Sequence, residues 1–100
     1  MGSELWTWDP RKDTLNKQKH KLSFENAIRV FELGSYLTQA DPCDWEQRWQ
    51  TVGLVQGVCI FVVHTEPDFD GRQVLKPGRI ISARKATKGE REAFYDEFYG

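Results

Sequence analysis

The side chains of this chain that are suited to phosphate chemistry are cationic, and they gather in two segments. Residues 11–21 contain five Lys or Arg and one acidic residue, and residues 79–91 contain the same numbers. Together the two segments hold 10 of the 14 Lys and Arg residues, although the whole chain has a net charge of -1. Clustered Lys and Arg bind phosphate groups, so the pattern predicts a phosphate-binding surface if folding joins the segments. Two separate solvated faces are the alternative interpretation.

Cleavage of RNA needs few groups beyond such cations. A base removes the proton of the 2′-hydroxyl, an acid protonates the leaving 5′ oxygen, and cations stabilise the charge on the phosphate. His and Lys side chains can transfer the protons, and Arg binds phosphate through paired contacts. The two basic segments contain all three residue types. A non-catalytic nucleic-acid-binding module uses the same types and is the alternative function.

Several other kinds of site are excluded because their motifs are missing. The sequence has no glycine-rich phosphate loop, GxSxG, HExxH or EF-hand motif. Cys43 and Cys59 form no CxxC motif, so we expect two free thiols, with one disulfide as the alternative, and neither a metal nor a cofactor. No apolar run could span a membrane and no secretory signal is visible, so we expect a cytoplasmic protein.

The elements that must position the cations form one α+β domain over residues 1–100, in the order β-α-α-β-β-β-α. We expect strands over 4–8, 46–55, 58–66 and 79–83, and helices from Asp9-Pro10 to about His20, from Ser23 to Gly34 and from the capping box Thr87 to Glu90 onward. Residues 35–45 read as irregular, and 67–78 as a loop or small hairpin. The hairpin signal Gln56-Gly57 and the short connections predict a small, mainly antiparallel sheet packed with helices.

The first helix has almost no apolar face that would place it in a core. Leu15 is its only large apolar residue, while Lys12, Asn16 and Lys19 share one face. We therefore predict that this helix lies beside the strand at 79–83 and lines a shallow cleft with its cations.

Arg79 or Arg84 of the second basic segment is the expected partner of Lys19 in that cleft. A regular strand points Arg79 and Arg84 to opposite faces. Both can reach one site only if the strand ends or bulges near Ala83.

Motifs in both halves of the chain occur together in one order. The first half contains Trp8-Asp9-Pro10, Lys12, Asn16, Lys19-His20, Ser23-Phe24-Glu25, Ala27 and Val30-Phe31, and the second contains Val62-Val63-His64-Thr65-Glu66, Arg79-Ile80-Ile81-Ser82-Ala83-Arg84-Lys85-Ala86, Glu90-Arg91 and Tyr95. Over about residues 6–95 the chain resembles the BrnT family, the ribonuclease toxins of BrnT/BrnA type II toxin–antitoxin systems.

The resemblance implies a RelE-like α+β fold and RNA cleavage that requires no metal and inhibits translation in bacteria. It also implies a hetero-oligomer with a BrnA-like antitoxin, which would connect the toxin indirectly to operator DNA. The chain departs from the family at Lys21, where Gly is usual, and in a longer segment between Glu66 and Arg79. Lys21 is expected to lengthen the helix or strain its end.

Eight residues are candidates for the site. The candidate catalytic residues are Lys19, His20, Arg79 and Arg84, and the candidate RNA-binding residues are Trp8, Lys12, Ser82 and Lys85. Arg79 and Arg84 are the expected transition-state cations, while the general base and general acid are not assigned. The alternatives are a helix-end cation for Lys19 and His20, a core aromatic for Trp8 and a sheet-face hydroxyl for Ser82.

Overall fold

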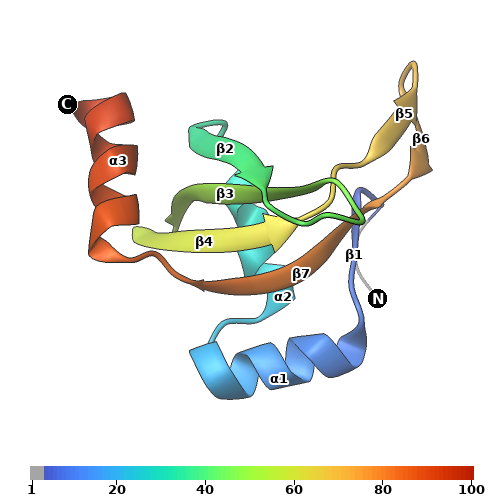
Figure 1. The fold of residues 1–100 in the computed structure, drawn as a ribbon, viewed down its shortest axis with the longest axis horizontal. Helices are drawn as coiled ribbons and strands as arrows, with labels where there is room; N and C mark the ends of the chain where they lie inside the picture. The colour runs from blue at the N-terminus through green and yellow to red at the C-terminus, as the bar shows by residue number, and fades with distance from the viewer. Residues whose placement is uncertain (1–3) are drawn as a thin grey trace.

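A five-stranded sheet organises residues 4–100, the part of the chain that the computed structural model describes (Figure 1). Its spatial order is β1-β7-β4-β3-β2, with strands β1 (Trp6–Thr7), β2 (Tyr36–Asp41), β3 (Arg48–Val55), β4 (Val58–His64) and β7 (Gly78–Lys85). Only the β1–β7 pairing in this sheet is parallel. The α+β class and the mainly antiparallel sheet are therefore confirmed.

A small hairpin and the helices complete the described chain. The hairpin consists of β5 (Asp68–Asp70) and β6 (Gln73–Lys76), and it projects from the body between β4 and β7 (Figure 1). The helices are α1 (Pro10–His20), α2 (Phe24–Ala27), the 3-10 helix η1 (Ile28–Phe31) and α3 (Lys88–Tyr99). None of the helices in residues 4–100 has the length and apolar character needed to span a membrane.

Helix α1 begins and ends at residues whose conformations explain its length. The side chain of Asp9 accepts a hydrogen bond from the Arg11 N–H at the N-cap, and Pro10 occupies the first turn, where no N–H is required. Lys21 ends the helix in the left-handed conformation, with φ 57° and ψ 31°. The strain that we expected at Lys21 is therefore present, because a side chain is unfavourable in this conformation.

The main core lies between one face of the sheet and the segment that contains α2 and η1. Phe24, Val30, Val62 and Ile80 are fully or almost fully buried there. Trp6 stacks on Phe31 with ring centroids 4.4 Å apart. The opposite face is covered at one end by α3, which packs Phe94 near Cys59 and Ala86, with Leu37, Val52 and Leu54 at its margin. The rest of that face is free to carry polar groups.

Asn16 explains why α1 runs along the edge of β7. Its side-chain amide donates to the Ala83 carbonyl at 2.7 Å, and its side-chain oxygen accepts from the Ala83 N–H at 3.2 Å. The same amide donates to the Leu22 carbonyl. The strand β1 pairs with β7 only at Gly78 and Arg79, so it does not reach the backbone groups of Ala83. The buried side chain of Asn16 satisfies these groups instead. The predicted position of this helix beside the strand at 79–83 is confirmed.

Two expectations about secondary structure were wrong. Residues 35–45 do not stay irregular, because Tyr36–Asp41 pair with β3 as an edge strand. Thr38 and Thr51 hydrogen-bond across this pair, as do Gln39 and Gln50, so polar side chains stabilise a strand that has little apolar character. The second helix does not continue in α conformation to Gly34 but tightens into η1 after Ala27.

Candidate active site

A bulge in β7 determines where its side chains point. His64 of β4 pairs with Ile80, and the preceding residue Val63 pairs with Ser82. Ile81 is therefore an extra residue that no residue of β4 opposes. Such an insertion reverses the alternation of side chains along the strand beyond it.

The reversal places both arginines of β7 on the same face of the sheet. Ile80 and Ala83 are both buried in the main core although they are three positions apart. Arg79 and Arg84 consequently point away from that core, and the 4.0 Å between the Arg84 guanidinium carbon and the centroid of the Phe61 ring agrees with this. Of the two conditions under which both arginines could reach one site, a strand end or a bulge near Ala83, the structure shows the bulge.

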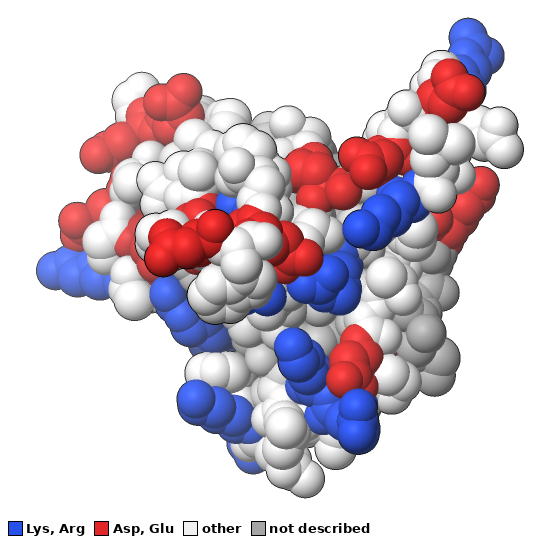
Figure 2. Space-filling model, turned by 45° about the vertical axis from the view of Figure 1, so that its right-hand side comes forward, with Lys and Arg blue, Asp and Glu red and all other residues white. Residues whose placement is uncertain are grey.

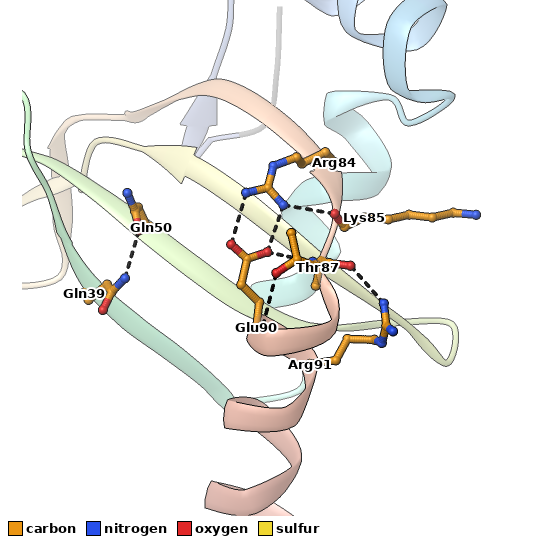
Figure 3. A network of polar contacts seen from close by, with 8 residues as sticks. Gln39, Gln50, Arg84, Lys85, Thr87, Glu90 and Arg91 are labelled. Carbon is orange, nitrogen blue, oxygen red and sulfur yellow. Dashed lines mark hydrogen bonds and ion pairs between the residues drawn. The ribbon is translucent and has the colours of Figure 1, made fainter.

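Arg84 belongs to a network that joins β7 to the first turn of α3 (Figure 3). Its guanidinium makes two hydrogen bonds to the Glu90 carboxylate, at 2.8 and 3.1 Å, and a third to the Lys85 carbonyl. Glu90 also closes the predicted capping box with Thr87. The Arg84 hydrogen bonds hold the pKa of Glu90 below its ordinary value. Much of the hydrogen-bonding capacity of Arg84 is therefore engaged within the protein.

Arg79 is bound less completely. Its Nη2 donates to Oε1 of Glu46 at 2.7 Å, and Nε of Arg48 donates to the same oxygen at 2.9 Å. These hydrogen bonds lower the pKa of Glu46 to about 2, and the one from Arg79 has the larger effect. A guanidinium has five N–H donors. Among the described residues, the contact with Glu46 uses only part of them, so Arg79 keeps N–H donors that could bind a phosphate. Its side chain is 37% exposed.

A pocket of about 260 Å³ opens beside Arg79, where β4 ends and β7 begins. The residues that line it are Glu46, Gln47, Trp49, Thr65, Glu66, Asp68, Lys76 and Arg79. Thr65 and Arg79 hold each other through two hydrogen bonds, from the Thr65 N–H to the Arg79 carbonyl and from the Arg79 N–H to the Thr65 hydroxyl. This wall of the pocket is therefore fixed by main-chain geometry.

His64 lies behind that wall and is fully buried. Its Nδ1–H donates to the Thr65 carbonyl at 3.0 Å, so Nε2 accepts the hydrogen bond of 2.6 Å from the Thr51 hydroxyl. Burial lowers the pKa of His64, which keeps the ring neutral. His64 is thus a core histidine that holds the backbone of Thr65.

The cations of α1 lie on the other side of the β7 edge. A second pocket, of about 200 Å³, is lined by His20, Lys21, Asn26, Gln56 and Lys85 together with apolar residues. Lys12 and Lys19 are exposed on α1. In the view of Figure 2 most Lys and Arg side chains lie across the middle and lower part of the molecule, over α1 and the neighbouring strand. The two basic segments therefore adjoin.

The candidate residues nevertheless do not all share one pocket. His20 and Arg79 line different pockets. Lys85 lies six positions beyond Arg79 along the strand, a distance of roughly 20 Å at about 3.3 Å per residue. The candidate cations thus follow the edge of β7 rather than surround one point.

The remaining candidates divide between the surface and the core. Ser82 is half-buried and shares the face of Arg79 and Arg84. Trp8 is only 7% exposed and packs edge-on against Phe24, so its ring cannot stack on an RNA base. The RNA-binding assignment of Trp8 is corrected accordingly, and the alternative of a core aromatic is confirmed.

Two carboxylates of the Arg79 pocket were missed as site residues. Glu66 ends the motif Val62-Val63-His64-Thr65-Glu66, and this was the available signal. Glu46 lies 33 residues before Arg79, and no local pattern connects the two. Burial raises the pKa of Glu66, in contrast to that of Glu46.

Cys43 and Cys59 are free cysteines, as expected. Within residues 4–100, no group of three or more His, Cys, Asp or Glu side chains is arranged to hold a metal ion.

A protein-family model described as "Ribonuclease toxin, BrnT, of type II toxin-antitoxin system" matches residues 8–90. The matched range extends from the N-cap region of α1 to the first turn of α3 and contains all eight candidate residues. No curated protein sequence matches the chain.

Proposed function

Because this chain belongs to the BrnT family of ribonuclease toxins of type II toxin–antitoxin systems, we propose that it cleaves RNA by attack of a 2′-hydroxyl on the adjacent phosphate. The products are a 2′,3′-cyclic phosphate and a 5′-hydroxyl end. The reaction requires no metal ion, since Arg and Lys side chains supply the positive charge that stabilises the phosphorane.

Arg79 carries this proposal. Its guanidinium is partly exposed at a pocket, and one hydrogen bond to Glu46 orients it without using all of its donors. A planar guanidinium can bind two phosphate oxygens at once. Arg79 is therefore the transition-state cation of this proposal. Arg84, which Glu90 binds through two hydrogen bonds, serves mainly to join β7 to α3.

The cations beyond Arg79 bind the rest of the substrate in this proposal. Lys12 and Lys19 flank Asn16 on the face of α1 that meets β7, and Lys85 lies with His20 at the far end of the same edge. Exposed cations in such a row bind successive phosphates of one strand without reading its sequence. Ser82 adds a hydroxyl on the face of Arg79.

The experiment that tests this function is RNA cleavage by the purified chain in the presence of EDTA, with the new ends identified chemically. We expect 2′,3′-cyclic phosphate ends and no effect of the chelator. An RNA in which 2′-deoxynucleotides replace the cleaved positions should bind but stay intact. Cleavage that stops in EDTA would refute the mechanism. Binding with steep salt dependence and no new ends would support a non-catalytic nucleic-acid-binding module instead.

Membership of a toxin–antitoxin family implies an antitoxin partner. We propose that this partner is a BrnA-like protein that neutralises the toxin and connects the hetero-oligomer to operator DNA. Co-expression with the neighbouring reading frame tests the pairing, since the correct partner should restore growth and copurify with the chain.

A further inference from the structure

The pocket beside Arg79 contains three carboxylates, and their surroundings differ. The Glu46 carboxylate accepts hydrogen bonds from two arginines, and its pKa of about 2 makes it a very weak base. Asp68 is exposed on the β5–β6 hairpin. Glu66 follows β4 at the pocket, and its side chain is 53% exposed but, unlike that of Glu46, accepts no hydrogen bond from an arginine.

Glu66 is not engaged by the groups around it. Its Oε1 lies 3.7 Å from Nδ1 of His64, too far for a hydrogen bond, and that nitrogen already donates to the Thr65 carbonyl. Within residues 4–100 no hydrogen bond engages the Glu66 carboxylate. Partial burial raises its pKa, so this carboxylate is a stronger base than Glu46.

The position of Glu66 relative to Arg79 is fixed through the intervening backbone. Thr65 makes two hydrogen bonds with Arg79, and His64 holds the Thr65 carbonyl from the core. Glu66 is the next residue, and its side chain lines the same pocket as the Arg79 guanidinium. A phosphate bound by Arg79 would therefore have a proton acceptor beside it.

We propose that Glu66 is the general base that removes the 2′-hydroxyl proton while Arg79 binds the scissile phosphate. This inference rests on the proposed function. The O–H bond of the 2′-hydroxyl breaks and its proton moves to a Glu66 carboxylate oxygen, while the 2′ oxygen forms a bond to phosphorus. The bond from phosphorus to the 5′ oxygen then breaks, and the 5′ oxygen takes its proton from a water molecule. The hydroxide that remains is neutralised by the proton held on Glu66.

The test compares Glu66→Gln and Glu66→Asp with the wild type, using Asp70→Asn as a matched control. Asp70 is an exposed carboxylate on the β5–β6 hairpin, and it does not line the pocket. We expect Glu66→Gln to lower kcat by roughly 10²- to 10⁴-fold, the usual contribution of a general base. Glu66→Asp should retain part of the rate, and Asp70→Asn all of it. The affinity for a 2′-deoxy-substituted RNA should stay the same in every variant, because none of the substitutions changes the Arg79 guanidinium that binds the phosphate.

The pH dependence of kcat distinguishes a base from a structural residue. In the wild type, kcat should fall as acid protonates Glu66, and burial raises the pKa at which this happens above that of an ordinary glutamate. Glu66→Asp should keep such a fall, whereas Glu66→Gln should lose it. If Glu66→Gln cleaves at the wild-type rate with the same acid limb, Glu66 is not the base, although the ribonuclease mechanism stands. If the wild type needs a metal ion, the proposed function fails, and this inference fails with it.

Discussion

The Nη2 atom of Arg79 lies 2.7 Å from Oε1 of Glu46, and the same oxygen accepts a hydrogen bond from Arg48. One carboxylate oxygen thus joins the first residues of β3 and β7 to the connection that follows β2. The contact orients the guanidinium that we propose to bind phosphate.

Acid should break this contact in a defined pH range. The pKa of Glu46 is about 2 in the fold against 4.5 for an ordinary glutamate, so its carboxylate stabilises the folded state fully above 4.5. The stabilisation decreases as the pH falls from 4.5 towards 2 and is absent below. The unfolding temperature of the wild type should therefore fall more than that of Glu46→Gln over this range. Equal falls would contradict the assignment, and Glu97→Gln, at an exposed position, serves as the control.

Arg79 and Arg84 should respond differently to truncation. Arg79→Ala should reduce kcat/KM by roughly 10²- to 10³-fold, as loss of a charge-stabilising donor does. Its free energy of unfolding should change by less than about 1 kcal/mol, since the Glu46 pair is partly exposed. Arg84→Ala should instead lower the free energy of unfolding by about 1–3 kcal/mol, because the ion pair to Glu90 and the contact with Phe61 are lost together.

Cleavage assays and urea unfolding of both variants measure this contrast. Arg72→Ala, at the exposed turn of the β5–β6 hairpin, provides an arginine control. The roles assigned here would have to be exchanged if Arg84→Ala lost cleavage at unchanged stability.

Asn16 should be among the most sensitive polar positions for stability. Asn16→Ala leaves the buried N–H and carbonyl of Ala83 without their side-chain partner, and each such group costs about 1–3 kcal/mol. We expect the free energy of unfolding to fall by about 2–4 kcal/mol in a urea titration. Leu15→Ala, one position earlier on the same helix but 62% exposed, should change it by less than about 0.5 kcal/mol. Similar effects of the two substitutions would mean that α1 packs differently.

Lys21→Gly should stabilise the protein. Lys21 has a left-handed backbone, which costs a residue with a side chain about 1–2 kcal/mol, and glycine removes most of that cost while adding flexibility to the unfolded chain. The expected net gain is about 0.5–1 kcal/mol, measured by thermal unfolding. Gln18→Gly within α1 should have the opposite effect, a loss of about 1 kcal/mol. A destabilised Lys21→Gly would show that the Lys21 side chain matters more than its backbone.

Local chemistry made much of the fold predictable from the sequence. Asp9 and Pro10 define the start of α1, Gln56-Gly57 forms the turn between β3 and β4, and Thr87 with Glu90 forms the capping box of α3. Each of these signals acts within a few residues, so no tertiary information was needed to interpret it. The adjacency of the two basic segments could also be inferred, from a helix with no apolar face.

The parts that could not be predicted depend on partners far away in the chain. The strand β2 has little apolar character and exists because β3 offers it hydrogen bonds. The pairing of Glu46 with Arg79 has no local signature. Arg79 and Arg84 can share one face of the sheet only if β7 is irregular between them, and this could be inferred from their spacing. The position of the bulge at Ile81 could not, because it depends on the register with β4. The assignment of Trp8 to RNA failed because an aromatic residue in a motif serves equally well in a core.

The two hydrogen bonds between Thr65 and Arg79 close a loop in the chain, because residues 66–78 leave and return at the same point. The β5–β6 hairpin inside this loop projects from the body and turns at Gly71, which has a positive φ of 61° and open space around it (Figure 1). Residues can therefore be added or removed at that tip without displacing the strands on either side. For protein engineering, the tip is the natural place to attach a fluorescent dye or an affinity tag, and for natural variation it is a place where length can change freely.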